Sequence, residues 1–483
     1  MLILVFVHYV LALVFGLTIC YTFQIKEYRF DRFKSMIKEI GVFRFLYSFK
    51  IHFPGITLRN ILILLAHFMI TSLVFLYSIE QIHLFTFLGR TFFLAPFTAL
   101  GAISVGVLIT NIPSSLIRSW IRRSAKIRVQ KSKAVFIGIT GSYGKTSTKE
   151  YLAHILSAQY EVAKTPKNMN TDVGIALSIN RSLTANTQYF ITELGAYRTG
   201  ELNHAASYIP FQYIILCGLG NQHLDLYGSK QALIKEETSP IFNLSPNGKA
   251  YLNIDSIKEN NIDLSSVPSV TYGSQKEADM RLIDIHTSSN GTRGTALYKN
   301  QHFQINTSLL GAHSLENILP AIAIAYDLGM DKELIEKQIR SIQPLKGKLS
   351  IHLGPSRSTI LHDGVNTNLN GFLAAIDVMN LFNHKKKMIM TQGIIELGGE
   401  KRSSYKSILN SMGGKNISLF TTDRLFNTIK SSVQINTFND VDSMKAAVVK
   451  ELNQNSLLLI EGAFAQPILT TFFSSESISN TNK

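Results

Sequence analysis

Three long apolar runs without a charged side chain occupy the first quarter of the sequence. They cover residues 1–23, 61–79 and 91–112. About 20 apolar residues in a helix are enough to span the ~30 Å hydrocarbon core of a bilayer. The pattern therefore predicts three transmembrane helices, at about residues 2–22, 61–79 and 91–112. A cleaved signal peptide is the alternative for the first run, but the basic residues that precede the apolar stretch of such a peptide are missing.

After residue 133 the pattern changes to short apolar runs that alternate with helical periodicity. Residues 134–140 (AVFIGIT), 187–195 (TQYFITELG) and 213–218 (YIILCG) have the length and apolar content of buried strands, and a helical pattern covers 146–159. This alternation predicts an α/β domain with a mainly parallel sheet. Residues 249–310 are rich in Thr, Ser and Asn and predict strands and hairpins at one edge of the sheet.

A second, smaller α/β unit is expected beyond the basic linker around Gly347. Apolar runs such as 387–391 (KMIMT) alternate there with helix-like stretches. We therefore predict a membrane region over 1–133, a central domain over 134–345 and a Rossmann-like C-terminal domain over 346–483.

Composition and charge support the membrane assignment. Charged residues make up only 17% of the chain and hydrophobic residues 46%, whereas soluble domains carry about 25% charged residues. The net charge of +15 would suit a nucleic-acid-binding protein, but residues 24–60 and 114–133 carry +12 of it and the rest of the chain is close to neutral. Basic residues flank membrane spans on their cytoplasmic side. We therefore predict a multi-pass protein of the cell membrane, with its catalytic domains in the cytoplasm and no nucleic-acid partner.

The strongest chemical motif is Gly138–Glu150, GITGSYGKTSTKE, which lies between a predicted strand and a predicted helix. A phosphate-binding loop requires this setting, because loop and helix N–H groups and a lysine together hold phosphate oxygens, and a hydroxyl follows for Mg²⁺. Ile139 stands where the strict pattern has its first glycine, so the loop is a variant. ATP and Mg²⁺ are the expected cofactors. The loop residues expected to bind them are Gly141, Ser142, Gly144, Lys145, Thr146 and Ser147.

Six further elements follow the loop in a fixed order. They are Asn168-Met-Asn170, Glu193-Leu-Gly195-Ala196, His223-Leu-Asp225, Gly311-Ala-His313 with Asn317, Lys346-Gly347-Lys348, and His362-Asp363. Together with the loop spacing T-G-S-x-G-K-T-S, this order resembles the Mur ligase family over roughly residues 134–400. The resemblance is most specific to the UDP-N-acetylmuramoyl-tripeptide D-alanyl-D-alanine ligase branch.

The resemblance implies ATP-dependent amide formation. A carboxylate attacks the γ-phosphate to give an acyl phosphate, and an amine then displaces phosphate. By the same resemblance, Thr146, Glu193 and His223 would surround the metal. Asn317 would bind the adenine, with Lys348 and Asp363 at the ribose or phosphates. The remaining implied site residues are Lys145 and His223 for catalysis and Asn168 and Asn170 for substrate binding.

Some positions depart from the family pattern. The family carries a carbamylated lysine eight residues after its Gly-Ser, and counting from Ser229 this position is Glu237. Since a glutamate is also an anionic oxygen ligand, we expect Glu237 to replace the carbamate as a catalytic residue, although a solvated helix charge remains an alternative. Near the end of the chain, Glu461-Gly-Ala stands where Lys-Gly-Ser is common. This change leaves the amino substrate open.

The largest departure is the membrane region, which occupies the place of a soluble uridine-nucleotide-binding domain. The sequence predicts a membrane-anchored ATP-dependent carboxylate–amine ligase of cell-wall precursor synthesis. Its partners would be a nucleotide- or lipid-linked carboxylate acceptor and an amino acid or dipeptide donor. Two alternatives are a nucleotide-binding membrane protein without ligase activity and a P-loop ATPase coupled to transport.

Overall fold

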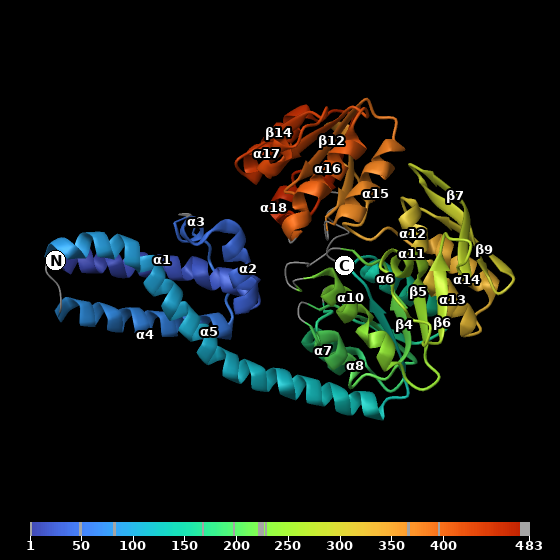
Figure 1. The fold of residues 1–483 in the computed structure, drawn as a ribbon, viewed down its shortest axis with the longest axis horizontal. Helices are drawn as coiled ribbons and strands as arrows, with labels where there is room; N and C mark the ends of the chain where they lie inside the picture. The colour runs from blue at the N-terminus through green and yellow to red at the C-terminus, as the bar shows by residue number, and fades with distance from the viewer. Residues whose placement is uncertain are drawn as a thin grey trace. The chain divides into compact units, whose positions relative to one another are not determined.

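The computed structural model describes residues 2–47, 51–80, 84–166, 169–196, 199–220, 227, 229–364, 368–394 and 397–473. The chain divides into two compact units, Met1–Arg123 and Ser124–Lys483 (Figure 1). Two separate sheets lie within the second unit. The division into three domains at residues 133 and 345 stays a prediction.

The first unit is built from three long apolar helices, as predicted. They are α1 (Leu2–Ile25), α4 (Leu58–Glu80) and α5 (Leu84–Lys131), with the shorter α2 (Phe30–Ile40) and α3 (Val42–Leu46) between the first two. The last eight residues of α5, 124–131, belong to the second unit. Phe6–Ile25, Leu58–Tyr77 and Leu94–Lys131 are long and apolar enough to cross a membrane. The third helix extends well past the predicted end at residue 112, because it continues through Pro113 into the basic segment. Insertion into a membrane stays a prediction.

Helices α1 and α4 run antiparallel. Near the start of α1, the Tyr9 hydroxyl lies 3.2 Å from Ser72 Oγ, near the end of α4. Near the end of α1, Cys20 Sγ donates to Asn60 Oδ1 at 3.5 Å, near the start of α4. Helix α5 runs antiparallel to α4 in turn. A Cβ added at Gly106 would lie 3.2 Å from the backbone of Ile63, which shows how closely these two helices approach.

The first sheet of the second unit has nine strands. In spatial order they are β2 (Val162–Lys164), β3 (Tyr189–Glu193), β1 (Val135–Thr140), β4 (Phe211–Leu216), β5 (Lys249–Asn253), β6 (Ser269–Gly273), β7 (Met280–Ser288), β8 (Gly291–Tyr298) and β9 (Gln301–Thr307). The pairs from β2 to β7 are parallel. Strands β7, β8 and β9 form an antiparallel meander, which Figure 1 shows at one edge of the sheet. The predicted parallel sheet with edge hairpins is confirmed.

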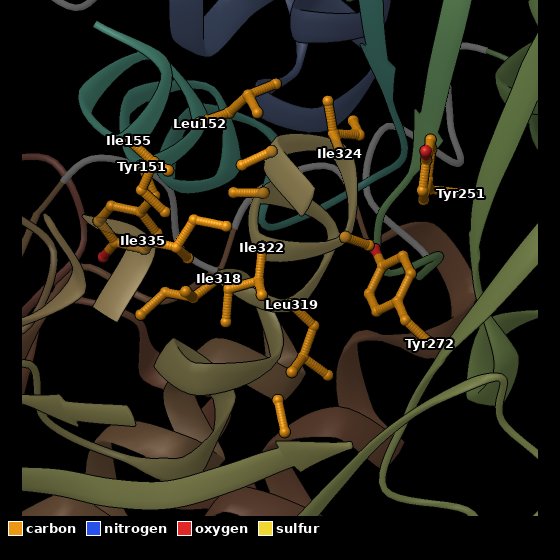
Figure 2. Close-up of a cluster of buried hydrophobic side chains, with 14 of the residues drawn as sticks. Tyr151, Leu152, Ile155, Tyr251, Tyr272, Ile318, Leu319, Ile322, Ile324 and Ile335 are labelled. Carbon is orange, nitrogen blue, oxygen red and sulfur yellow. The ribbon is translucent and has the colours of Figure 1, made fainter. Parts of the chain in front are cut away.

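Helices cover this sheet and supply its core. They are α6 (Lys145–Leu156), α7 (Asp172–Ser182), α8 (Glu201–Ala206), α10 (Lys230–Thr238), α11 (Ile254–Glu259), α12 (Ala312–Glu316), α13 (Leu319–Asp327) and α14 (Lys332–Ser341), with the 3-10 turn η1 (Ser239–Asn243). Figure 2 shows α6 and α13 packing apolar side chains, among them Leu152, Ile155 and Ile322, into one cluster with tyrosines of the sheet. Helix α12 ends at Glu316, and α13 begins at Leu319 with a proline in its first turn.

The second sheet has six strands. In spatial order they are β10 (Ser350–Leu353), β11 (Thr359–Asp363), β15 (Ser456–Glu461), β12 (Lys386–Thr391), β13 (Ile417–Thr421) and β14 (Ile435–Thr437). Only β10 is antiparallel to its neighbour. The helical segments here are η2 (Pro355–Arg357), α15 (Leu369–Asn380), η3 (Gly398–Glu400), α16 (Lys401–Met412), η4 (Arg424–Thr428), α17 (Val441–Glu451) and α18 (Gln466–Leu469). Two separate apolar clusters include side chains of this sheet, as expected for a Rossmann-like unit.

Candidate active site

The loop after β1 requires glycine at two positions. Gly141 has φ +126° and Gly144, which precedes the first residue of α6, has φ +86°. Residues with a side chain rarely adopt this left-handed region. A Cβ at Gly144 would also lie only 2.5 Å from Asn317 Oδ1. The loop therefore has the strand–loop–helix geometry that the motif predicted.

Glu237 and Gly218 hold the inner side of this loop. Thr140 Oγ1 and the Gly141 N–H donate to Glu237 Oε2 at 2.7 and 2.9 Å. The Ser142 N–H donates to the Gly218 carbonyl at 2.8 Å. These N–H groups are thus occupied. The first N–H groups of a helix have no intrahelical acceptor, so those at the start of α6 are the ones that suit phosphate oxygens.

Glu193, the last residue of β3, is buried and fully paired. Its Oε1 accepts from Thr146 Oγ1 at 3.0 Å and from Asn170 Nδ2 at 3.2 Å, and its Oε2 accepts from Lys149 Nζ at 3.2 Å. Burial raises the pKa of Glu193, but the charges of Lys149 and Lys145 and these hydrogen bonds outweigh it, so the pKa lies below its ordinary value. Glu193 is therefore an anion at neutral pH.

Two lysines on α6 lie in different surroundings, one at the loop and one among buried acids. Lys145 Nζ lies against the Gly141 carbonyl, at the loop. Lys149, one helical turn later, is fully buried and forms ion pairs with Glu193 and Glu150. A fully buried lysine is rare unless it is paired. Lys149 was not predicted as a site residue, although its spacing of four from Lys145 on the same helix face would have been a usable signal.

Two neighbouring cavities surround these groups. The first has a volume of about 780 Å³, open solvent included, and contains the loop residues from Ser142 to Ser147 together with Asn170, Glu193 and Glu237. The second, of about 1030 Å³ on the same measure, contains Asn317 and Asp363. Lys348 lines both.

The predicted site residues are thus brought together with few exceptions. Gly141 lines neither cavity, because its N–H points to Glu237. His223 and Asn168 lie outside the described residues. Glu237 is only 5% exposed, so the alternative of a solvated helix charge was wrong.

The donor atoms present fit Mg²⁺. Thr146 and Glu193 offer a hydroxyl and a carboxylate within 3.0 Å of each other, and a small hard cation prefers oxygen ligands. Over the described residues, no group of three or more His, Cys, Asp or Glu side chains could hold a metal. Mg²⁺ typically takes one or two protein ligands and completes its shell with water and phosphate oxygens, and the Thr146 hydroxyl and the Glu193 carboxylate can serve as such ligands.

A second acidic centre lies at the end of the other sheet. Asp363 and Glu461 are the last residues of β11 and β15 and stand opposite each other in register. Glu461 is fully buried, and neither of its carboxylate oxygens has a hydrogen-bond partner in the described structure. Burial raises the pKa of Asp363 to about 6, although Lys348 lowers it. Burial and the nearby Asp363 raise the pKa of Glu461 well above its ordinary value, so both facing acids bind protons more readily than isolated carboxyl groups do.

Comparison with known proteins supports this geometry. Residues 139–325 match the Mur ligase middle domain. The chain is 26% identical over 361 residues to UDP-N-acetylmuramoyl-tripeptide–D-alanyl-D-alanine ligase of Escherichia coli (strain K12), covering 73% of this chain and 75% of that protein. It is 27% identical over 308 residues to the enzyme of the same name from Bacillus subtilis (strain 168), covering 63% of this chain and 65% of that protein.

Solved structures agree in fold. MurF from Acinetobacter baumannii has a TM-score of 0.66 at 20% identity and covers 73% of this chain and 80% of its own. MurF ligase from Thermotoga maritima, solved in complex with ADP, has a TM-score of 0.66 at 21% identity, with coverage of 73% and 82%. Residues 139–325 thus match the Mur ligase middle domain, and the relatives above are named as ligases. The chain is similar to the UDP-N-acetylmuramoyl-tripeptide–D-alanyl-D-alanine ligases, which confirms the resemblance found from the motifs.

Proposed function

We propose that this protein is a membrane-anchored ATP-dependent ligase that joins a carboxylate to an amine through an acyl phosphate. One observation carries the proposal. Lys145, the Thr146 hydroxyl and the ionised Glu193 line one cavity at the start of α6, and Lys348 enters it from the linker. Phosphoryl transfer depends mainly on positioning and on charge neutralisation, and this arrangement supplies both.

The residues of the site would act in the following way. Lys145 and the first N–H groups of α6 would hold the β- and γ-phosphates of ATP. Thr146 and Glu193 would hold Mg²⁺, which neutralises phosphate charge when bound. An oxygen of the acceptor carboxylate attacks the γ-phosphorus and ADP leaves. The amine nitrogen then attacks the acyl carbon, phosphate leaves, and the amine loses a proton.

Two further residues would keep this machinery in place. Lys149 keeps Glu193 ionised through its ion pair at 3.2 Å. Glu237 fixes the loop through Thr140 and Gly141, and it stands where the family carries its carbamylated lysine. We therefore propose that the Glu237 carboxylate supplies the anionic oxygen that the carbamate supplies elsewhere.

The substrates are proposed from the relatives. Their names specify a UDP-N-acetylmuramoyl-tripeptide and D-alanyl-D-alanine. By analogy, the acceptor would be the carboxylate of a cell-wall precursor, and the donor an amino acid or dipeptide. The three apolar helices and their basic flanks support a place in the cell membrane with the catalytic unit in the cytoplasm.

A phosphate-release screen tests this function. Full-length protein in detergent would receive Mg²⁺–ATP and a carboxylate, either nucleotide-linked, lipid-linked or free, paired with amino acids or dipeptides. We expect phosphate release only when a carboxylate and an amine are both present. Phosphate release with neither present would favour an ATPase instead. Tight ATP binding without turnover across the whole screen would favour a nucleotide-binding protein without ligase activity.

A further inference from the structure

One side chain of the loop after β1 lies where the two cavities meet. Tyr143 lines both of them, as do Lys348 and Asn368. The first cavity contains Lys145 and the start of α6, which would hold the β- and γ-phosphates, and the second contains Asn317, which would bind the base. A nucleotide that occupies both cavities would therefore pass Tyr143 at the point where its phosphates join the ribose.

The Tyr143 ring is held in place by the backbone that follows β4. The Tyr143 N–H donates to the Gly218 carbonyl at 3.1 Å. A Cβ added at Gly218 would overlap the ring, and one added at Gly220 would lie 3.3 Å from it. Glycine allows a side chain to come this close to the backbone because it has no Cβ. The ring is therefore positioned by two glycines, and its hydroxyl group has a defined location.

The Tyr143 hydroxyl accepts a hydrogen bond from the helix that begins the second sheet's cover. Asn370 Nδ2 donates to it at 3.3 Å. Asn370 lies in the first turn of α15, two residues after Asn368, whose side chain caps this helix. A tyrosine hydroxyl can both accept and donate. Within the described residues no group accepts its proton, so the O–H group is left to donate to a ligand.

The hydroxyl retains this proton at neutral pH. Burial raises the pKa of Tyr143, the hydrogen bond from Asn370 lowers it by less, and the nearby acids Glu259, Glu316 and Asp255 raise it further. An exposed tyrosine already has a pKa of about 10. Tyr143 therefore offers a neutral O–H donor at the junction of the two cavities.

A phosphate oxygen fits this donor better than a ribose hydroxyl does. Hydrogen bonds to an ionised acceptor are shorter and about twice as strong as those between neutral groups. The cationic Lys348 lines both cavities at the same junction, so a negative charge is favoured there. The phosphate nearest to the ribose is the one that would reach this junction.

We propose that the Tyr143 hydroxyl donates a hydrogen bond to the α-phosphate of the bound nucleotide and that Asn370 orients this hydroxyl. Tyr143 is then a binding residue, and Asn370 is a positioning residue that acts through it. Because Asn370 belongs to α15, the same contact connects the loop of the first sheet to a helix of the second. The inference rests on the nucleotide site of the proposed function, but not on the ligation step.

The test measures equilibrium binding of ADP, AMP and adenosine to the full-length protein in detergent, with no acceptor or amine present. Tyr143→Phe keeps the ring and removes only the hydroxyl. It should weaken the binding of ADP and of AMP about tenfold, as the loss of a hydrogen bond to a charged group does. Binding of adenosine, which has no phosphate, should stay within about twofold of the parent.

A second substitution tests the orienting role of Asn370. Asn370→Ala should weaken ADP binding about threefold, because the hydroxyl remains but is no longer oriented. The double variant should bind ADP no more weakly than Tyr143→Phe alone, since Asn370 acts only through the hydroxyl. The matched controls are Tyr160→Phe, which loses a bonded hydroxyl outside both cavities, and Asn410→Ala, an exposed asparagine of α16. Both should bind ADP within about twofold of the parent.

The outcomes separate this inference from the ligase proposal. Parental ADP affinity in Tyr143→Phe would overturn the donor, and equal weakening of adenosine and ADP would overturn its assignment to a phosphate. Weakening of ADP without weakening of AMP would overturn the choice of the α-phosphate. Additive losses in the double variant would overturn the role of Asn370. If Tyr143→Phe weakens ADP binding as expected while the parent releases no phosphate in the substrate screen, the ligase proposal fails and this one stands.

Discussion

Two buried glutamates end parallel strands in the second unit, and their surroundings are opposite. Glu193, at the end of β3, uses both carboxylate oxygens in hydrogen bonds and pairs with Lys149. Glu461, at the end of β15, has no hydrogen-bond partner for either oxygen within the described structure and faces a second acid, Asp363. The pKa of Glu193 is lowered and that of Glu461 is raised. The surroundings of the same residue type at the same place in a sheet thus favour the ionised form in one case and the protonated form in the other.

The comparison shows that the carboxyl edge of a parallel sheet does not set the charge of its acids. Ligands bind at this edge in open α/β sheets. The charge that a ligand should carry there depends on how many lysine side chains lie near the acids. Lysines on α6 supply this charge for Glu193. At the second edge, Lys348 opposes two carboxyl groups. The first edge suits a cation bound to phosphates, and the second suits a group that brings positive charge.

The largest effect should come from Lys145→Ala at the paired edge. Without this ammonium the developing charge of the phosphoryl group is not neutralised, so turnover should fall about 1000-fold. Phosphate release with the active substrate pair measures it. Lys164→Ala is the control, since Lys164 pairs with Glu150 and is partly exposed. Turnover by Lys145→Ala at the parental rate would contradict the phosphate-loop assignment.

Lys149→Met should cause the next largest effect, this time on stability. The substitution leaves the buried Glu193 carboxylate without its cation, and breaking a buried pair from one side costs about 3 kcal/mol. Thermal unfolding of the full-length protein measures it. Lys164→Met removes a more exposed lysine and should cost less than about 1 kcal/mol. Equal losses in the two variants would show that Glu193 does not depend on Lys149.

Glu237→Ala should weaken both the loop and its Mg²⁺ dependence. Two hydrogen bonds to Thr140 and Gly141 are lost, which should cost about 2 kcal/mol and raise the Mg²⁺ concentration needed for turnover. The neighbouring Glu236 is a matched control. Its carboxylate accepts instead from the Gly200 and Leu202 N–H groups, so Glu236→Ala should destabilise without altering the Mg²⁺ titration. An unchanged titration in Glu237→Ala would rule out the carbamate replacement.

The smallest effect, and one of opposite sign, is expected for Glu461→Gln. The raised pKa values of Glu461 and Asp363 mean that the stability from this pair is complete below about pH 4 and falls as the pH rises through about 6. A neutral amide at residue 461 removes this loss and should stabilise the protein by about 1 kcal/mol at pH 8. Unfolding temperatures at pH 5 and pH 8 measure it. Glu193→Gln should instead destabilise at pH 8, and the same sign in both variants would refute the comparison.

The sequence was most informative where structure depends on neighbouring residues. The loop in GITGSYGKTSTKE could be predicted because its glycines, lysine and helix start are adjacent. The three apolar helices could be predicted because each contains about 20 consecutive residues without a charge. Helix α5 still extends past its predicted end, since the basic residues after Pro113 favour a helix and proline is tolerated there.

Contacts between distant residues could not be predicted in the same way. The Lys149–Glu193 pair joins α6 to β3, and the Asp363–Glu461 pair depends on two strands that become neighbours only in the folded sheet. The order of motifs located Glu193 and Asp363 as site residues. The order of motifs could not predict which charged side chain lies next to each acid, because strand order in a sheet is a property of the tertiary fold.

Lys348 couples the two cavities electrostatically. Its single ammonium lines both of them and lowers the pKa of Asp363 and of Glu461. A triphosphate in the first cavity would partly neutralise the positive charge of Lys348. The pKa values of the two acids would then rise, and they would bind protons more tightly. Nucleotide binding should therefore be accompanied by proton uptake from the buffer, and by thermodynamic reciprocity a mildly acidic medium should tighten nucleotide binding.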